Sequence, residues 1–313
     1  MRSTELVGTI VPLVTPFAGD ESPDLPATGR LIEFVLEQGA DALMPTALTG
    51  EGPLLTADET LAVWDAVFDR AAGRLPVVPA VIATTTRLAS RLVRAAEERG
   101  AAAVMAAPIL PELYAGRAES DVLAFYADLA AATPSLPLIL FNYPSLTGVD
   151  FVPSLVARLA EIDSVRYVKE STGDTRRVHA IQRLVGDRLA VICGAPNVAL
   201  ESLALGCRAW ITGIMNVVPR SAQQLMRAVT ERNDLRLARR IYYTQVLPVV
   251  DVLAGNFNPT GTIKAGVCAR GVDVGAPRRP GHAVSPADQE LLARLVAAIA
   301  RAEAETAAEL ARG

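Results

Sequence analysis

Residues 165–171 read Val-Arg-Tyr-Val-Lys-Glu-Ser, a short and largely apolar run that ends in charged and polar side chains. A run of this length and composition predicts a strand buried in a parallel sheet. Similar runs, each bounded by turn residues, begin near Leu6, Ala42, Pro76, Ala102, Pro137, Leu189 and Arg208. The sequence therefore predicts eight strands, with room for helices between them.

Helical patterns fill the gaps between these runs. Thr56 and Glu59 form a capping-box pattern, and further helices are expected over residues 121–129 and 178–185. Eight strand–helix units predict an α/β fold, the (β/α)8 TIM barrel. The alternative is a doubly wound open sheet, which usually carries a Gly-rich turn after its first strand. Here that strand ends in Thr15-Pro16-Phe17, which favours the barrel.

The last part of the chain exceeds what a barrel needs. It is mostly helical, with helical segments expected over 235–253, 259–269 and 285–310. A cluster of Gly and Pro over 271–281 predicts a surface loop between helices. We expect a barrel domain over residues 1–233 and a C-terminal helical domain over 234–313.

The composition is that of a globular protein. Apolar residues make up 51% of the 313 residues, charged residues make up 20%, and the net charge is -4. This balance argues against a disordered chain, a nucleic-acid interface and an anionic-membrane surface. The 3 cysteines show no metal-ligand spacing and are too few and odd in number for a disulfide framework. With no targeting or membrane-spanning segment recognised in the sequence, we expect a cytoplasmic protein.

Lysine occurs only at Lys169 and Lys264, although Lys and Arg together number 30. Arginine could therefore replace lysine wherever only a positive charge is needed. Arginine holds its proton, whereas lysine can lose it and act as a nucleophile. Lys169 lies at the end of the strand quoted above, and barrel enzymes build their active sites at the carboxyl ends of their strands.

Alternation along this strand places Val165, Tyr167 and Lys169 on one face. If Val165 faces inward, Lys169 lies at the mouth of the barrel, where burial lowers the pKa of an amine. A neutral lysine attacks a ketone to give a Schiff base, which is an electron sink for C–C or C–O cleavage. The alternative is a lysine in an ion pair with Glu170 or another carboxylate.

A second candidate cluster, Thr49-Gly50-Glu51, follows the second strand. A hydroxyl and free backbone N–H groups in a tight Gly turn can hold an anion such as a keto-acid carboxylate. The alternative is an ordinary loop in which Thr49 caps a helix. Because His, Asp and Glu show no ligand spacing, we expect no metal, and no other cofactor is expected.

The sequence resembles the dihydrodipicolinate synthase / N-acetylneuraminate lyase family of Schiff-base aldolases. The matching segments occur in the family's order and span nearly the whole chain: Gly8-Thr9 through Phe17, Thr49-Gly50-Glu51, Phe141-Asn142-Tyr143-Pro144 with Thr147-Gly148, Val168-Lys169-Glu170 through Asp174, Gly194, and Asn258-Pro259 with Lys264-Ala265. The resemblance implies a barrel with a C-terminal helical domain, a homotetramer (a dimer of dimers) and a small 2-keto acid as substrate.

The resemblance also implies roles for individual residues. Lys169 is implied to form the Schiff base, and the Thr49-Gly50 turn to hold a pyruvate-type carboxylate. Lys264 is interpreted as structural, as are the acids Glu51 and Glu170. Further substrate-binding residues are expected at the strand ends, namely Leu48, Gly194, Ile211 and Thr212.

Several positions depart from the synthase branch of the family. Phe141 stands where a proton-shuttling tyrosine is usual, and Leu48 replaces a threonine. A tyrosine expected after Pro108, in the stretch Ile109-Leu110, is missing, and Leu146 takes the place of an arginine that grips the aldehyde. We therefore expect a divergent member and not an authentic synthase. Leucine at position 146 is more like the lyase and sugar-acid aldolase branches.

Proton transfer then needs another group. Tyr143 lies two residues after Phe141, on the same face of an extended strand, although packing at the barrel rim is its alternative role. Thr49, Thr212, a water or the substrate's own carboxylate are further candidates. Two functions remain: a class I lyase acting on pyruvate or a 2-keto-3-deoxy acid, and a catalytically impaired barrel that binds a keto acid as a sensor or scaffold. The retained Lys169 favours the lyase.

Overall fold

The computed structural model describes residues 5–108, 119–255 and 258–310. Each predicted run forms a strand: β1 (Gly8–Pro12), β2 (Ala42–Met44), β3 (Ala80–Ala83), β4 (Val104–Pro108), β5 (Leu138–Asn142), β6 (Val165–Glu170), β7 (Ala190–Cys193) and β8 (Ala209–Ile211). Paired strands are parallel, in the order β2-β1-β8-β7-β6-β5-β4-β3. A parallel bridge between Leu43 and Val77 joins β2 to the segment before β3, so the barrel is nearly closed. The predicted TIM barrel is confirmed, and the open doubly wound sheet is excluded.

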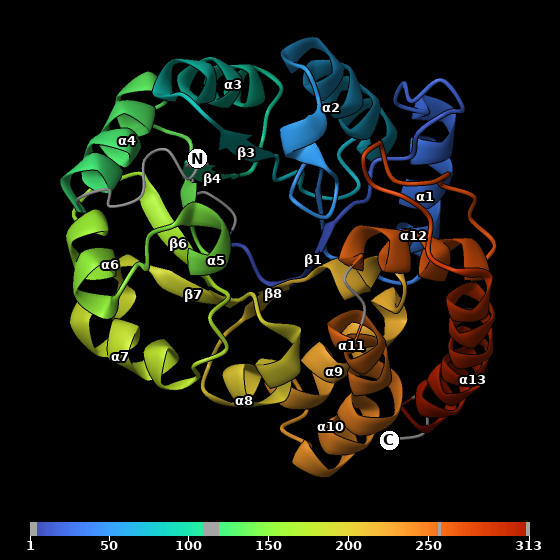
Figure 1. Cartoon of the computed structure of the whole chain (residues 1–313). Helices are drawn as coiled ribbons and strands as arrows, with labels where there is room; N and C mark the ends of the chain where they lie inside the picture. The colour runs from blue at the N-terminus through green and yellow to red at the C-terminus, as the bar shows by residue number, and fades with distance from the viewer. Residues whose placement is uncertain (1–4, 109–118, 256–257, 311–313) are drawn as a thin grey trace.

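Helices surround the ring of strands (Figure 1). They are α1 (Leu25–Glu37), α2 (Ala57–Ala71), α3 (Thr86–Glu98), α4 (Glu119–Ala132), α5 (Pro144–Thr147), α6 (Pro153–Leu159), α7 (Arg176–Val185), α8 (Ala199–Ala204) and α9 (Pro219–Thr230). Short 3-10 helices are η1 (Gly52–Leu54), η3 (Gly186–Arg188), η4 (Pro196–Val198) and η5 (Gly213–Asn216). α2 begins with the predicted capping box of Thr56 and Glu59. Within the described ranges, no helix has the length and apolar character needed to cross a membrane.

The chain continues after α9 with α10 (Leu235–Ile241), α11 (Leu247–Ala254), α12 (Pro259–Ala269) and α13 (Pro286–Leu310). A single helix was expected over 235–253, but a π-helical turn, η6 (Tyr242–Val246), divides it. Pro248 has no N–H to donate to the Thr244 carbonyl, which explains the wider turn before it. The Gly/Pro-rich segment 271–281 lies between α12 and α13, as predicted.

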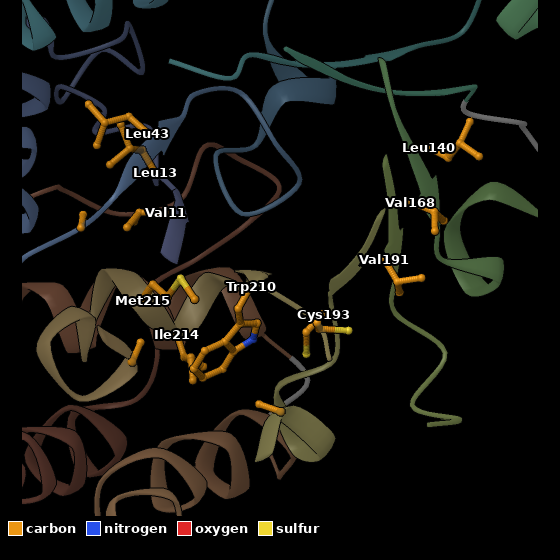
Figure 2. Packing of buried hydrophobic residues seen from close by; sticks show 14 of the residues in the cluster. Val11, Leu13, Leu43, Leu140, Val168, Val191, Cys193, Trp210, Ile214 and Met215 are labelled. Atoms are coloured by element: carbon orange, nitrogen blue, oxygen red, sulfur yellow. The ribbon is translucent and has the colours of Figure 1, made fainter. Parts of the chain in front are cut away.

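The strands present alternate side chains to two buried layers. The interior layer fills the barrel with residues that include Ile10, Met44, Met105, Ile139, Phe141, Tyr167, Ile192 and Ile211. The outer layer packs the strands against the helices, and Figure 2 shows Leu140, Val168 and Val191 of this layer on three successive strands. Because neighbours along a strand face opposite ways, Val168 faces the helices and Lys169 the interior.

The prediction for the start of β6 is wrong. Val165 packs in the outer layer, and not on the inward face with Tyr167. The pairing of β5 with β6 shifts after Leu138, which lies opposite Val165, because the next residue of β5 lies opposite Tyr167. Arg166 is the extra residue of this irregularity, and it restores the inward direction of Tyr167. Lys169, two residues later, therefore still faces the barrel interior.

Candidate active site

Lys169 lies at the carboxyl end of β6, on the interior side of the barrel. Its side chain is buried, and Nζ lies 4.3 Å from the centroid of the Phe141 ring. Phe141 of β5 and Ile192 of β7 are its neighbours in the two strand pairs. Burial in these apolar surroundings lowers the pKa of Lys169 from 10.5 to about 8. The neutral amine that a nucleophile requires is therefore available near physiological pH.

The alternative ion pair between Lys169 and Glu170 is not present. The Glu170 carboxylate accepts hydrogen bonds from Asn142 Nδ2 at 2.8 Å and from the Thr172 N–H at 2.7 Å. Among the residues that the structure describes, none forms an ion pair with Lys169. Burial raises the pKa of the Cys193 thiol on the adjacent strand to about 12, so this thiol is neutral. No described negative charge therefore stabilises the ammonium form of Lys169.

Phe141 contacts both Lys169 and Tyr143. The rings of Phe141 and Tyr143 stack with their centroids 6.0 Å apart and an interplanar angle of 28°. Tyr143 follows β5 directly and its side chain is 38% exposed, so its hydroxyl-bearing ring lies at the rim and not in the core. The structure thus brings the three predicted catalytic residues together in one row.

Gly194 follows β7 and packs against the stem of Lys169. Its N–H donates to the Glu170 carbonyl at 2.8 Å. A Cβ at this position would lie 2.9 Å from Lys169 Cγ and 2.1 Å from Ser171 Oγ. Residue 194 must therefore be glycine if Lys169 is to keep this position.

Two backbone donors in the turn after β2 have no acceptor among the residues that the structure describes. The Glu51 N–H closes the turn by donating to the Leu48 carbonyl at 2.9 Å. Over the described ranges, no hydrogen bond involves the N–H of Thr49 or of Gly50. Two adjacent free N–H groups next to a hydroxyl form an arrangement suited to an anion. Thr49 caps neither of the next two helices, because Thr56 is the N-cap of α2 and Glu51 is the N-cap of η1.

Side chains from two other parts of the barrel fix this turn. The hydroxyl of Thr15, which follows β1, donates to the Gly50 carbonyl at 2.6 Å. Trp64 of α2 donates its Nε1–H to Thr46 Oγ1 at 2.8 Å, and that hydroxyl donates to the Ala80 carbonyl at 2.9 Å. The turn is therefore held before any ligand binds.

The end of β8 packs against the same turn. A Cβ at Gly213 would lie 2.9 Å from Thr49 Oγ1 and 2.8 Å from Ile263 Cδ1. Ile263 comes from α12, and no local pattern in the sequence predicts that it reaches the barrel rim. The remaining expected substrate-binding residues lie at this end of the barrel. Thr212 is buried, and Ile211 and Leu48 pack in the interior layer.

Two expected features cannot be placed. The stretch Ile109-Leu110 lies outside the described residues, as does the side chain of Leu146, whose backbone belongs to α5. His179 and His282 are both exposed. In the part of the chain that the structure covers, no group of three or more His, Cys, Asp or Glu side chains is arranged to hold a metal ion.

Residues 5–299 match the model of the Dihydrodipicolinate synthetase family. The chain belongs to this family. It is 33% identical over 307 residues to the 4-hydroxy-tetrahydrodipicolinate synthase of Thermomicrobium roseum, and the alignment covers 98% of each chain. The class of enzyme that these comparisons support is therefore a lyase of the dihydrodipicolinate synthetase family.

Solved structures of this family share the fold. Dihydrodipicolinate synthase from Aquifex aeolicus gives a TM-score of 0.86 at 30% identity, over 93% of this chain and 97% of that one. The structure of dihydrodipicolinate synthase from Acinetobacter baumannii complexed with pyruvate gives a TM-score of 0.86 at 28% identity. The match covers 95% of this chain and 99% of that one.

Proposed function

We propose that this member of the dihydrodipicolinate synthetase family is a class I lyase, in which Lys169 forms a Schiff base with pyruvate or a 2-keto-3-deoxy acid. The observation that carries the proposal is the buried amine of Lys169 at the end of β6, with no ion pair among the described residues. A pKa near 8 leaves a useful fraction of this amine neutral at physiological pH. A lysine retained in an arginine-rich chain supports the same role.

The Thr49-Gly50 turn is the proposed site for the keto-acid carboxylate. Its two unused N–H groups and the Thr49 hydroxyl supply donors, and Thr15 and Trp64 hold the turn from outside. A carboxylate held by preformed donors keeps the substrate's carbonyl carbon in one position. This is the binding that an attacking amine needs.

In the proposed reaction the neutral amine of Lys169 attacks the C2 carbonyl carbon and forms a C–N bond. The carbonyl oxygen leaves as water with both amine protons, which a nearby group must carry, and the imine nitrogen then takes up one further proton from solvent or from that group. In the protonated imine, the C2=N bond acts as the electron sink for aldol cleavage: the C4 hydroxyl gives its proton to a base and becomes the aldehyde carbonyl, the C3–C4 bond breaks, and its electron pair forms a C2=C3 bond. Condensation uses the same imine in the opposite direction.

Tyr143 is the proposed proton carrier. Phe141 occupies the position where the synthase branch usually has a tyrosine, and it has no hydroxyl. The Tyr143 ring stacks on the Phe141 ring, and the Phe141 ring contacts the Lys169 amine. One ring therefore separates the Tyr143 side chain from this amine. Thr49 and Thr212 stay as alternative carriers.

The proposed difference from an authentic 4-hydroxy-tetrahydrodipicolinate synthase concerns the second substrate. Leu48 and Phe141 give the site apolar groups where that branch uses hydroxyls, and Leu146 supplies no guanidinium for an aldehyde. We infer an aldehyde with fewer hydroxyl groups than a sugar has. The proposal includes the homotetramer and the cytoplasmic location that the family resemblance implies, and no cofactor.

The experiment is a screen for turnover with the purified chain. Pyruvate release is measured from a panel of 2-keto-3-deoxy acids, and formation of 4-hydroxy-tetrahydrodipicolinate is measured in parallel, with Lys169→Ala as the control. Cleavage of a keto acid by the wild type alone is the expected result. If pyruvate forms a trapped adduct but no substrate turns over, the second function holds, a barrel that binds a keto acid as a sensor or scaffold.

A further inference from the structure

Helix α12 brings two adjacent residues to the rim of the barrel. Ile263 lies against Gly213, which also contacts Thr49. Lys264, the next residue, reaches Glu51 in the Thr49-Gly50-Glu51 turn, with Nζ and Oε1 2.8 Å apart. Both side chains are buried, at 1% and 4% exposed. A buried ion pair therefore connects the C-terminal helices to the proposed carboxylate site.

The contacts around this ion pair fix both partners. The Lys264 ammonium donates to the Ala276 carbonyl at 2.9 Å and lies 4.4 Å from the centroid of the Phe17 ring. The second carboxylate oxygen of Glu51 accepts the Arg278 N–H at 2.8 Å. The Glu51 side chain is thus held from α12 and from the segment that follows it.

Stability alone gives little reason for such a pair. Desolvation of two buried charges offsets most of their attraction, and apolar side chains of similar volume often serve as well. The Arg278 guanidinium lies 4.6 Å from the same Phe17 ring centroid and pairs with Glu59. An arginine at position 264 would bring a second guanidinium to this ring, whereas lysine brings a compact ammonium.

The backbone of Glu51 lies in an unusual conformation. Its φ is 55°, a left-handed conformation that is strained for a residue with a side chain. This conformation redirects the chain directly after Gly50, where the N–H groups of Thr49 and Gly50 donate to no residue in the described part of the chain. An anchored Glu51 side chain can hold the strained turn, whereas a free side chain would let it relax.

We propose that Lys264 is a positioning residue for the substrate: through Glu51, it holds the Thr49-Gly50 turn in the conformation that binds the keto-acid carboxylate. The inference rests on the proposed function, because it assumes that this turn binds a carboxylate. It goes beyond it by extending the site to α12, outside the ring of strands.

The test measures the pyruvate concentration at which borohydride trapping of the 313-residue chain reaches half of its maximum. We call it the half-saturating pyruvate concentration. Lys264→Met should raise this concentration about tenfold or more, the loss expected when a charge-assisted hydrogen bond to an anion is weakened. The extent of trapping at saturating pyruvate should be retained, because Lys169 is untouched. Glu51→Gln, which keeps the side-chain shape, should act in the same direction. The double variant should be no worse than the more affected single one, since the two residues act as a unit.

A matched control comes from a second buried ion pair at the same helix. Arg270 follows α12 and pairs with Glu303 of α13 at 3.0 Å, with side chains 9% and 4% exposed. Arg270→Met removes a comparable buried charge pair that does not touch the turn. It should lower the melting temperature and leave the half-saturating pyruvate concentration unchanged.

An unchanged half-saturating concentration in folded Lys264→Met or Glu51→Gln would overturn the inference. An equal rise in Arg270→Met would also overturn it, because the effect would then follow general stability. If neither Lys264→Met nor Glu51→Gln folds, as judged by circular dichroism, the pair serves folding and the positioning role is wrong. Absence of any adduct in the wild type is a distinguishable result, because it overturns the proposed function itself and this inference with it.

Discussion

The Nζ atom of Lys169 lies 4.3 Å from the centroid of the Phe141 ring, across the pairing of β6 with β5. The ring attracts an ammonium group, but it also removes water from it. Desolvation is the larger effect here, since the pKa of Lys169 falls to about 8. Phe141 therefore helps to lower the pKa of the Lys169 amine.

Imine formation should follow the neutral fraction of Lys169. Its rate is expected to rise with pH through about 8 and then to level off, whereas an unburied lysine would give a rise up to about 10.5. The measurement is the rate of borohydride-trapped pyruvate adduct against pH, over the range in which circular dichroism shows an intact fold. A rate that climbs without a plateau until about 10.5 would show that the amine is not desolvated.

Lys169→Met should stabilise the fold at neutral pH. The folded pKa lies below the unfolded one, so below about 8 the folded protein carries the cost of a buried ammonium. The fall from 10.5 to about 8 corresponds to about 3 kcal/mol. Urea unfolding at pH 7 should therefore give a free energy of unfolding about 1–3 kcal/mol higher in the variant.

The stability difference between Lys169→Met and the wild type should depend on pH. Wild-type stability should rise as pH increases from about 8 to 10.5, because only the unfolded chain still binds the proton in that window. The advantage of Lys169→Met should shrink over the same window. If the variant is less stable than the wild type at pH 7, the buried ammonium of Lys169 does not destabilise the fold, and the account is wrong.

Gly194→Ala should disturb Lys169 directly. The new Cβ would lie 2.9 Å from Lys169 Cγ and 2.8 Å from the Glu170 carbonyl oxygen, so the lysine stem or the strand end must move. We expect at least about a tenfold slower imine formation and a loss of about 1–3 kcal/mol in stability. Gly29→Ala, in α1 with nothing within 4 Å of the new Cβ, is the control and should form the imine at the wild-type rate. Equal rates for the two variants would remove Gly194 from the site.

Tyr143→Phe tests the proposed proton carrier. The substitution keeps the ring that stacks on Phe141 at 6.0 Å and deletes only the hydroxyl. Turnover should fall about 10²-fold or more, as expected for loss of a general acid–base group, while the half-saturating pyruvate concentration stays the same. Tyr243→Phe, at an exposed position of η6, serves as the matched control. Unaltered turnover in Tyr143→Phe would show that Tyr143 is not the proton carrier and would leave Thr49, Thr212 or water as the candidates.

Local composition was sufficient to predict the barrel. Strands such as β5 and β6 are buried on both faces, so they stand out as short apolar runs, and their polar ends mark the mouth. Asn258 and Pro259 predict the start of α12 for a local reason as well, because the Asn258 side chain accepts the Gly261 N–H at 2.9 Å. Lys169 could be predicted for the same reason, as a rare lysine at a strand end.

Features that depend on pairing between distant segments could not be predicted. The outward direction of Val165 follows from a shift in the pairing of β5 with β6, which no feature of the β6 sequence reveals. The contact of Ile263 with the rim and the ion pair of Lys264 with Glu51 depend on where α12 packs. From the sequence alone, Lys264 was therefore interpreted as structural, and its ion-pair partner Glu51 was not predicted.

The most direct test of the central claim is borohydride trapping of the wild-type protein with pyruvate near neutral pH, read by intact mass and peptide mapping beside a Lys169→Ala control. The account predicts one stable adduct per chain, located on Lys169 and lost in the variant. No adduct in folded protein, or an adduct on Lys264 in place of Lys169, would contradict it.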